Sequence, residues 1–398
     1  MSCQPEAPVL SINELEFLVI GAGPTGLGAA LRLEELGRDW QLLEASSGFG
    51  GLASSWVDDQ GFTWDLGGHV QFSHYDRFDR YMDLALGADG WLSHERESWI
   101  WLRNRFIPYP FQNNLHRLDG EDRWHCLEGL LDANIRAGLG RSEPTRATTC
   151  SNFGEWMDAT FGPGIAELFM RPYNRKVWAC PPEEMDFGWI GERVSVPDLR
   201  RVLRTLCTQM DDVSWGPNAL FRFPKQGGTG AIWDRLGRSL PAQRVRLDTR
   251  IIAIHAHDHV AVCADGTRWK YRHLLSTMPL NRLIERAPGV VANDIATQLR
   301  YSTTTVIGVG IKGQTPEALA SKCWMYFPAC NSPYYRVTVF SNYSPYNVPQ
   351  PGRQWSLMAE VASPPDQPID PEEVTQATIR ALREDGLLPP QAALQSVV

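Results

Sequence analysis

Between residues 15 and 44 the spacing of the hydrophobic residues along the chain changes twice. The short apolar run Leu15–Ile20 predicts a buried strand of the parallel type. Leu27–Leu36 carries its apolar residues at helical spacing, and Gly37 follows as a helix-ending residue. A second apolar run, Trp40–Leu43, ends on Glu44. This order of periods predicts a strand–helix–strand unit.

Later parts of the chain divide into a helical half and a strand-rich half. Helical spacing returns in segments 121–138, 152–171 and 197–211. Four β-rich runs then predict an antiparallel sheet: Thr303–Val309, Trp324–Phe327, Tyr334–Phe340 and Trp355–Val361. Asp370-Pro-Glu-Glu373 supplies an N-cap, a proline at the first helical position and two acids in the first turn, so a helix is expected over 370–386.

The loop between the first strand and its helix, Gly21-Ala-Gly-Pro-Thr-Gly26, is a dinucleotide-binding fingerprint in its required context. Gly21 allows the tight turn, Gly23 lets the backbone approach a pyrophosphate, and Gly26 lets the helix pack close to the strand. The N-terminus of the helix offers free N–H groups to the phosphates. Glu44 stands where a carboxylate can accept hydrogen bonds from a ribose hydroxyl.

Two further glycine-rich turns indicate that the dinucleotide is FAD. Residues 48–54 are expected to form a turn that nicotinamide-binding domains do not usually need. In an FAD-binding domain, the chain crosses the extended cofactor a second time at this turn. Residues 65–75 are expected to reach the isoalloxazine, because two adjacent glycines permit close approach and an imidazole follows them. The predicted cofactor-binding residues are Gly21, Gly23, Thr25, Gly26, Glu44, Gly50, Gly51, Leu52, Gly67, Gly68 and His69.

These elements predict an α/β fold, with a Rossmann-like FAD-binding domain, a helical insertion and an antiparallel β-sheet substrate domain. We expect the FAD-binding domain over 1–85 and 218–290, the helical domain over 118–212, and the sheet domain over 86–117 and 300–365, before the helix 370–386. A length of 398 residues is consistent with two or three domains.

Composition and charge narrow the range of partners. The net charge of -8 argues against general nucleic-acid binding, which needs a basic face. Eight scattered cysteines without a Cys-x-x-Cys pair are typical of a reducing compartment, and no apolar run is long enough for a signal peptide or membrane span, so we expect a cytoplasmic protein without membrane contact. His255, His257 and His259 alternate, but the pattern favours a solvent-facing hairpin over a metal site, and no metal is expected.

Beyond the fingerprint, the chain resembles the eukaryotic type of UDP-galactopyranose mutase from about residue 16 to 385. The strings that carry the resemblance include Gly-Gly-His-Val-Gln-Phe-Ser-His-Tyr at 67–75 and Pro-Tyr-Pro-Phe-Gln-Asn-Asn at 108–114. The other matching stretches are 19–28, 169–178, 191–194, 215–218, 322–328, 335–336 and 340–347.

The resemblance implies a flavin-dependent mutase that interconverts UDP-galactopyranose and UDP-galactofuranose, in galactofuranose biosynthesis for the cell wall. It implies that N5 of reduced FAD acts as nucleophile at the anomeric carbon, and that NADPH supplies the reduction. It implies catalytic roles for His69, Arg193 and Arg336. The two arginines stand at the family's pyrophosphate-binding positions, where a planar guanidinium can donate two hydrogen bonds to phosphate oxygens. The implied contacts to the UDP-sugar are Tyr109, Phe111, Gln112, Asn174, Trp178, Arg193, Asn218, Trp324, Tyr326 and Arg336.

Relative to the family, the sequence ends early. Family members continue past this point with a segment that supplies an arginine and several tyrosines, and Ala392–Val398 is expected to be the start of a strand cut before it. A catalytically inactive FAD- and UDP-sugar-binding fold is therefore one alternative. A flavin amine oxidase relative is another, disfavoured by Arg193, Arg336 and residues 108–114, because an oxidase needs no diphosphate site. A homo-oligomer is left open.

Overall fold

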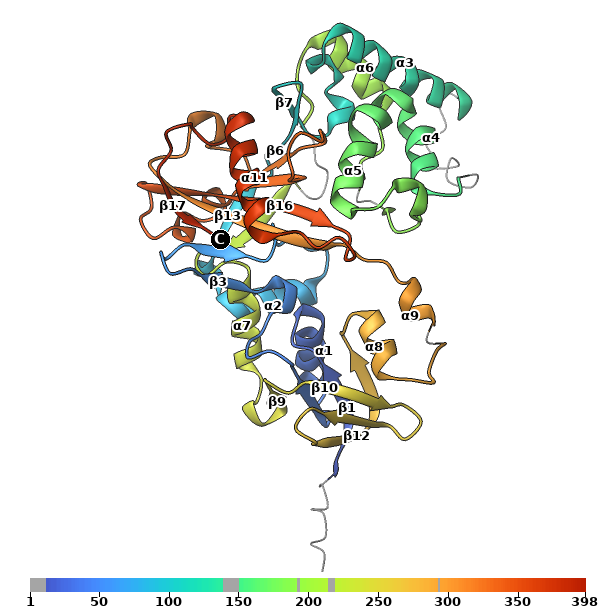
Figure 1. Ribbon diagram of the computed structural model, residues 1–398, viewed down its shortest axis with the longest axis vertical. Coiled ribbons are helices and arrows are strands. Elements are labelled where there is room, and N and C mark those ends of the chain that lie inside the picture. Colours follow the sequence, from blue (N-terminus) through green and yellow to red (C-terminus); the bar gives the residue numbers. More distant parts are fainter. Residues whose placement is uncertain (1–11, 139–149, 192–193, 214–218, 293) are drawn as a thin grey trace, which may run out of the picture. The chain divides into compact units, whose positions relative to one another are not determined.

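The structure, a computed structural model, describes residues 12–138, 150–191, 194–213, 219–292 and 294–398 in two compact units (Figure 1). Unit 1 comprises Met1–Trp56, Ser73–Trp91 and Gln226–Arg300. Unit 2 comprises Val57–Phe72, Leu92–Lys225 and Tyr301–Val398. The predicted division into FAD-binding, helical and sheet domains stays a prediction.

Unit 1 is built on a six-stranded sheet with the order β10-β11-β12-β1-β2-β9. Its parallel part consists of β12 (Arg268–Ser276), β1 (Ile12–Ile20), β2 (Trp40–Leu43) and β9 (Val245–Arg246). Strand β11 (Val260–Cys263) pairs with β12 in the antiparallel direction, and β10 (Ile251–His255) pairs with β11 to form a hairpin. The three alternating histidines lie at and beyond the end of β10, which confirms the predicted hairpin.

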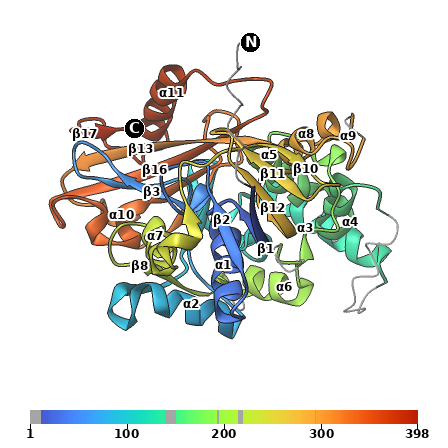
Figure 2. The same cartoon turned by 90° about the horizontal axis from the view of Figure 1, so that it is seen from below.

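Helix α1 (Pro24–Glu35) joins β1 to β2, so the predicted strand–helix–strand unit is confirmed. Its apolar side packs against α2 and α7 through a core that includes Leu27, Met82 and Ile232. The helices of this unit are α1, α2 (Asp76–Leu86), α7 (Gly230–Ser239), α8 (Leu280–Arg286) and α9 (Asp294–Gln298). Figure 2 shows β1, β2 and α1 close together.

Unit 2 contains a seven-stranded sheet with the order β17-β13-β16-β15-β14-β6-β7. Its strands are β6 (Ser98–Leu102), β7 (Arg105–Pro108), β13 (Thr303–Lys312), β14 (Trp324–Tyr326), β15 (Arg336–Val339), β16 (Gln354–Ser363) and β17 (Leu394–Val397). All pairs are antiparallel except β14 with β6. The predicted antiparallel sheet is thus confirmed, and β7 is at its edge.

Helix α11 (Pro371–Glu384) packs on this sheet through Val374, Ile379 and Leu382 (Figures 1 and 2). The carboxylate of Asp370 accepts hydrogen bonds from the N–H groups of Glu372 and Glu373, which confirms the predicted N-cap.

Four other helices among the described residues of unit 2 gather around a second core (Figure 1). They are α3 (Gly120–Arg136), α4 (Phe153–Ile165), α5 (Arg171–Trp178) and α6 (Leu199–Thr208), with a π-helical turn at Ala166–Met170 between α4 and α5. Helices α3 and α4 touch through glycines: a Cβ on Gly162 would lie 2.1 Å from the carbonyl oxygen of Gly129. Such close packing leaves α3 and α4 little freedom to shift against each other.

Short elements complete the chain. They are β3 (Ser55–Val57) with β4 (Thr63–Asp65), β5 (Trp91–Glu95) with β8 (Leu220–Pro224), and α10 (Phe340–Tyr343). The final apolar run does form a strand, β17, which pairs with β13, and the hydroxyl of Ser396 donates to Asp58. Among the described residues no helix is both long enough and apolar enough to cross a membrane.

Candidate functional site

Unit 1 holds two of the predicted glycine-rich turns, and they are in direct contact. The N–H of Gly50 donates to the carbonyl oxygen of Ala22 at 2.9 Å. A Cβ on Gly51 would lie 3.3 Å from the Cα of Gly23, and a Cβ on Gly26 would lie 1.9 Å from the carbonyl oxygen of Gly21. A side chain at Gly26 would clash with the backbone of Gly21, and one at Gly51 would press on Gly23, so the close contact of the two turns depends on these glycines.

These turns fit the pyrophosphate and ribose of a dinucleotide. Helix α1 begins without a side-chain cap, and no described residue accepts the N–H groups of Thr25 and Gly26, so they are available to an anion. A Cβ on Gly23 would meet nothing closer than 3.9 Å, which leaves the backbone open to a ligand. The Glu44 carboxylate is held at the turn by the N–H of Ala22 at 2.7 Å. Leu52 is 82% exposed and takes no part in the core.

Unit 2 places Arg336 opposite Glu360, as cross-strand partners on β15 and β16. Nε and Nη2 of Arg336 donate to the two carboxylate oxygens, Nη2 at 2.7 Å. Burial alone would raise the pKa of Glu360, but the charge and hydrogen bonds of Arg336 hold it below its usual value. A fixed, ionised carboxylate therefore orients the guanidinium, whose Nη1 has no partner among the described residues.

The turn Gly67–His69 is attached to the same ion pair. The N–H of Gly68 donates to Oε1 of Glu360 at 3.2 Å. A Cβ on Gly68 would lie 3.1 Å from Nε1 of Trp324 and 3.3 Å from Nη2 of Arg336, and Gly67 has a φ of +122°. A side chain would be strained at Gly67 and would crowd Trp324 and Arg336 at Gly68, so the two glycines let the turn hold His69 beside Arg336 and Glu360.

The surroundings of His69 favour its neutral imidazole. Burial lowers its pKa, and the charge of Arg336 lowers it further, while that of Glu360 acts in the opposite direction. Its Nδ1 is buried and has no hydrogen-bond partner in the described part of the chain. One ring nitrogen of the imidazole is thus left without a partner in the part of the chain that the structure describes.

Glu360→Gln is expected to lower the pKa of His69 further, because it removes the one charge that raises it. The amide keeps the shape of the carboxylate, so the turn can stay in place. A proton NMR titration of the histidine Cε1–H signals measures the shift. His94 is an internal control: burial lowers its pKa too, but its hydrogen bond goes to the carbonyl oxygen of Tyr343, so it should not change. An upward shift of His69 would contradict the assignment.

Two guanidinium groups lie close to the ring of Trp324. The Cζ atoms of Arg96 and Arg336 lie 4.6 Å and 5.4 Å from its ring centroid. Burial lowers the pKa of Arg96. Nε1 of Trp324 is buried without a partner among the described residues, so the indole has a donor to offer beside Gly68.

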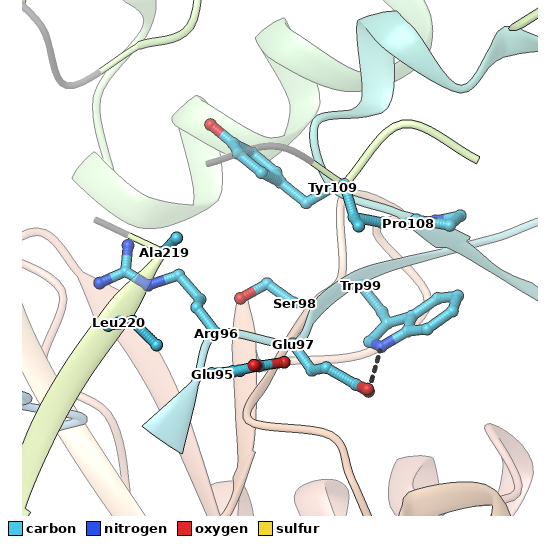
Figure 3. Close-up of a pocket in the computed structure, with 10 residues that line it drawn as sticks. Glu95, Arg96, Glu97, Ser98, Trp99, Pro108, Tyr109, Ala219 and Leu220 are labelled. Carbon is cyan, nitrogen blue, oxygen red and sulfur yellow. Dashed lines mark hydrogen bonds between the residues drawn. The ribbon is translucent and has the colours of Figure 1, made fainter. Parts of the chain in front are cut away.

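Aromatic residues extend this cluster toward a cavity. The ring centroid of Tyr326 lies 5.8 Å from that of Tyr109 and 5.2 Å from that of Tyr173. Tyr109 also borders a cavity of about 280 Å³ (Figure 3). Its lining residues are Glu95, Arg96, Glu97, Ser98, Trp99, Pro108, Tyr109, Val213, Ala219 and Leu220. In Figure 3, Arg96, Ser98 and Tyr109 surround the same space.

Other predicted substrate residues occupy different surroundings. Phe111 is fully buried against Phe169, at 5.0 Å between centroids, and Gln112 donates to the carbonyl oxygen of Ser195 at 2.5 Å. Asn174 donates to the carbonyl oxygen of Met170 within its own helix. Trp178 is 39% exposed at the end of α5. Arg193 and Asn218 lie outside the described residues.

The sequence reasoning missed three members of the cluster: Glu360, Arg96 and Tyr173. Only Glu360 left a signal, since it is the single charged residue in the mostly apolar run 355–362. Arg96 stands between two glutamates, which suggests a solvated surface rather than a partner for an indole.

Comparison with known proteins identifies the family. A sequence model described as flavin containing amine oxidoreductase matches residues 24–397. A crystal structure of reduced UDP-galactopyranose mutase is 45% identical, with a TM-score of 0.89, over 96% of this chain and 80% of that one. The chain is a member of the UDP-galactopyranose mutase family. Because the family model covers most of its length, the chain also belongs to the flavin-containing amine oxidoreductases.

More distant matches agree on the fold alone. Wild-type putrescine oxidase bound to putrescine is 16% identical, with a TM-score of 0.62, over 97% of this chain and 85% of that one. The zeta-carotene desaturase of Synechocystis is 40% identical over 61 residues, 15% of this chain and 12% of the desaturase. Membership of the UDP-galactopyranose mutase family confirms the resemblance and the fold class predicted from the sequence, and it supports FAD as the group that fits the glycine turns.

Proposed function

We propose that this protein is a flavin-dependent mutase that interconverts UDP-galactopyranose and UDP-galactofuranose. The observation that carries the proposal is the environment of Arg336. Glu360 orients its guanidinium, which lies near the ring of Trp324, and its Nη1 has no partner among the described residues and can bind a ligand. When bound, reduced FAD supplies N5 as the nucleophile for the anomeric carbon. The Gly21–Gly26 and Gly50–Gly51 turns would hold its pyrophosphate, and Glu44 its ribose.

In this proposal Arg336 binds the diphosphate that leaves the sugar and later returns. A charge-assisted hydrogen bond from Nη1 stabilises the negative charge that develops on the diphosphate when the glycosidic bond breaks. Because Glu360 already fixes the guanidinium, little reorientation is needed at that moment. Tyr109 and Tyr326 supply flat apolar surfaces for the nucleotide and sugar. Arg193 and Asn218 keep their predicted roles as further substrate contacts.

His69 is assigned the contact with the flavin. Its neutral imidazole and open Nδ1 suit a hydrogen bond to a ring nitrogen whose proton changes during the reaction. We also propose NADPH as the reductant, and a cytoplasmic location, which the scattered cysteines without a Cys-x-x-Cys pair favour.

The test is turnover of UDP-galactopyranose by protein reduced with dithionite under anaerobic conditions, with the furanose product separated chromatographically. Product from the reduced protein, and none from the oxidised protein, is expected. A flavin-loaded protein that binds UDP but gives no furanose under reduction would overturn the proposal. Oxygen consumption with a diamine such as putrescine, without furanose, would favour the amine oxidase alternative.

A further inference from the structure

Lys176 extends from α5 to the loop that follows β14. Its Nζ donates to the carbonyl oxygens of Phe327 and Ala329 at 2.9 Å each and of Ser332 at 3.0 Å. An ammonium has three N–H donors, so the three carbonyls use all of them. The lysine thus closes a loop of unit 2 onto a helix that is about 150 residues away in sequence.

The ammonium is at a site that disfavours its charge. Burial lowers the pKa of Lys176 to about 8, while Cys330 of the same loop and Asp385 at the end of α11 favour the charged form. A neutral amine has only two N–H donors and would leave one carbonyl unpaired. Retaining an ammonium here is costly, and the three carbonyl contacts offset that cost.

Two positions on α5 determine how the helix lies on β14 and its loop. Tyr173 and Lys176 are three residues apart and share a face; Tyr173 packs on Tyr326, and Lys176 bonds to the loop. Asn174 and Trp178 are four residues apart and share the neighbouring face. Rotation of the helix would therefore move both of these predicted substrate residues together.

We propose that Lys176 is a positioning residue for the mutase reaction. By fastening α5 to residues 327–332, it sets the positions of Asn174 and Trp178 relative to Trp324 and Tyr326. This inference rests on the proposed function, because these four side chains matter as its substrate contacts. Lys176 itself touches no reacting atom. It lies in the matching stretch 169–178 but is not among the site residues that the resemblance implies.

The test compares Lys176→Met with Arg175→Met, which removes a charge from an exposed neighbour on the same helix. We expect kcat with reduced flavin to fall roughly tenfold or more in Lys176→Met, because small misplacements of substrate contacts slow the chemical step. Affinity for UDP should stay within about twofold, because Arg336 and Tyr109 are on other elements. Lys176→Arg, which keeps the charge, should recover part of the loss.

Hydrogen exchange in the oxidised protein without substrate gives a readout independent of turnover. Faster exchange is expected across 171–178 and 327–332 in Lys176→Met, and not in Arg175→Met. Unchanged exchange, or equal losses of kcat and UDP affinity in both variants, would overturn the positioning role. If wild-type protein shows no mutase activity, the proposed function fails, yet the exchange result still decides whether Lys176 fastens the helix.

Discussion

Arg336→Met should lower the free energy of unfolding by about 3–5 kcal/mol at neutral pH, because it leaves a charged carboxylate buried without its partner. Glu360 is only 2% exposed, and its remaining contacts would be the N–H of Gly68 at 3.2 Å and the hydroxyl of Tyr335 at 3.5 Å. Urea denaturation followed by circular dichroism measures the change.

The pH dependence of this loss has a definite sign. In the wild type the pKa of Glu360 is lowered, so the carboxylate stabilises the fold above its unfolded pKa of about 4.5, and that contribution is lost as the pH falls through the folded pKa. Without Arg336, burial is the largest remaining influence and raises that pKa. The stability deficit of Arg336→Met should therefore shrink as the pH falls from 7 toward 4.5.

The matched control is the double variant Arg336→Met with Glu360→Gln, which removes both charges. It should recover most of the lost stability, because no charge is left buried. It should not recover UDP binding, where the loss of a charged hydrogen bond to the diphosphate costs about 2–5 kcal/mol. A double variant as unstable as Arg336→Met would show that the arginine acts through packing; normal UDP affinity in either variant would remove Arg336 from the substrate site.

The sequence predicted the parts of the fold whose local signals agree with each other. The glycine fingerprint, the apolar strands on both sides and Asp370 at the start of α11 each specify one geometry, and the structure has all three. Helix α2 was missed although Phe78, Tyr81, Met82, Ala85 and Leu86 recur at helical spacing and pack on the core of unit 1; no capping side chain marks its start. In α4, the predicted helix 152–171 continues through a π-helical turn into α5.

The candidate site was less accessible to sequence reasoning, since it depends on register. Arg336 and Glu360 are 24 residues apart, and nothing local says that they face each other across β15 and β16. A shift of one residue would put Glu360 on the other face of the sheet. Phe111 stands in a matching motif, yet its side chain is fully buried against Phe169, a difference that only packing could reveal.

Gly26→Ala should abolish retention of FAD and lower the free energy of unfolding by about 3 kcal/mol or more, the upper range for overpacking a tight site. Its Cβ would lie 1.9 Å from the carbonyl oxygen of Gly21, a backbone atom that cannot rotate away as a flexible side chain could. Gly21 has no room to retreat, since a Cβ on it would already lie 2.1 Å from the Thr277 hydroxyl. Helix α1 would have to move off β1, taking the open N–H groups of Thr25 and Gly26 away from the pyrophosphate.

Gly28→Ala is the matched control, two residues further along the same helix. A Cβ there would meet nothing within 4 Å, and alanine favours a helix over glycine by up to about 1 kcal/mol, so this variant should be as stable as the wild type or more so. The visible absorbance of flavin that remains with the purified protein, together with thermal unfolding, separates the two. If Gly26→Ala stayed yellow and stable, α1 would not need its close approach to Gly21, and the fingerprint would not be the FAD site; equal damage from Gly28→Ala would point instead to a general sensitivity of the helix.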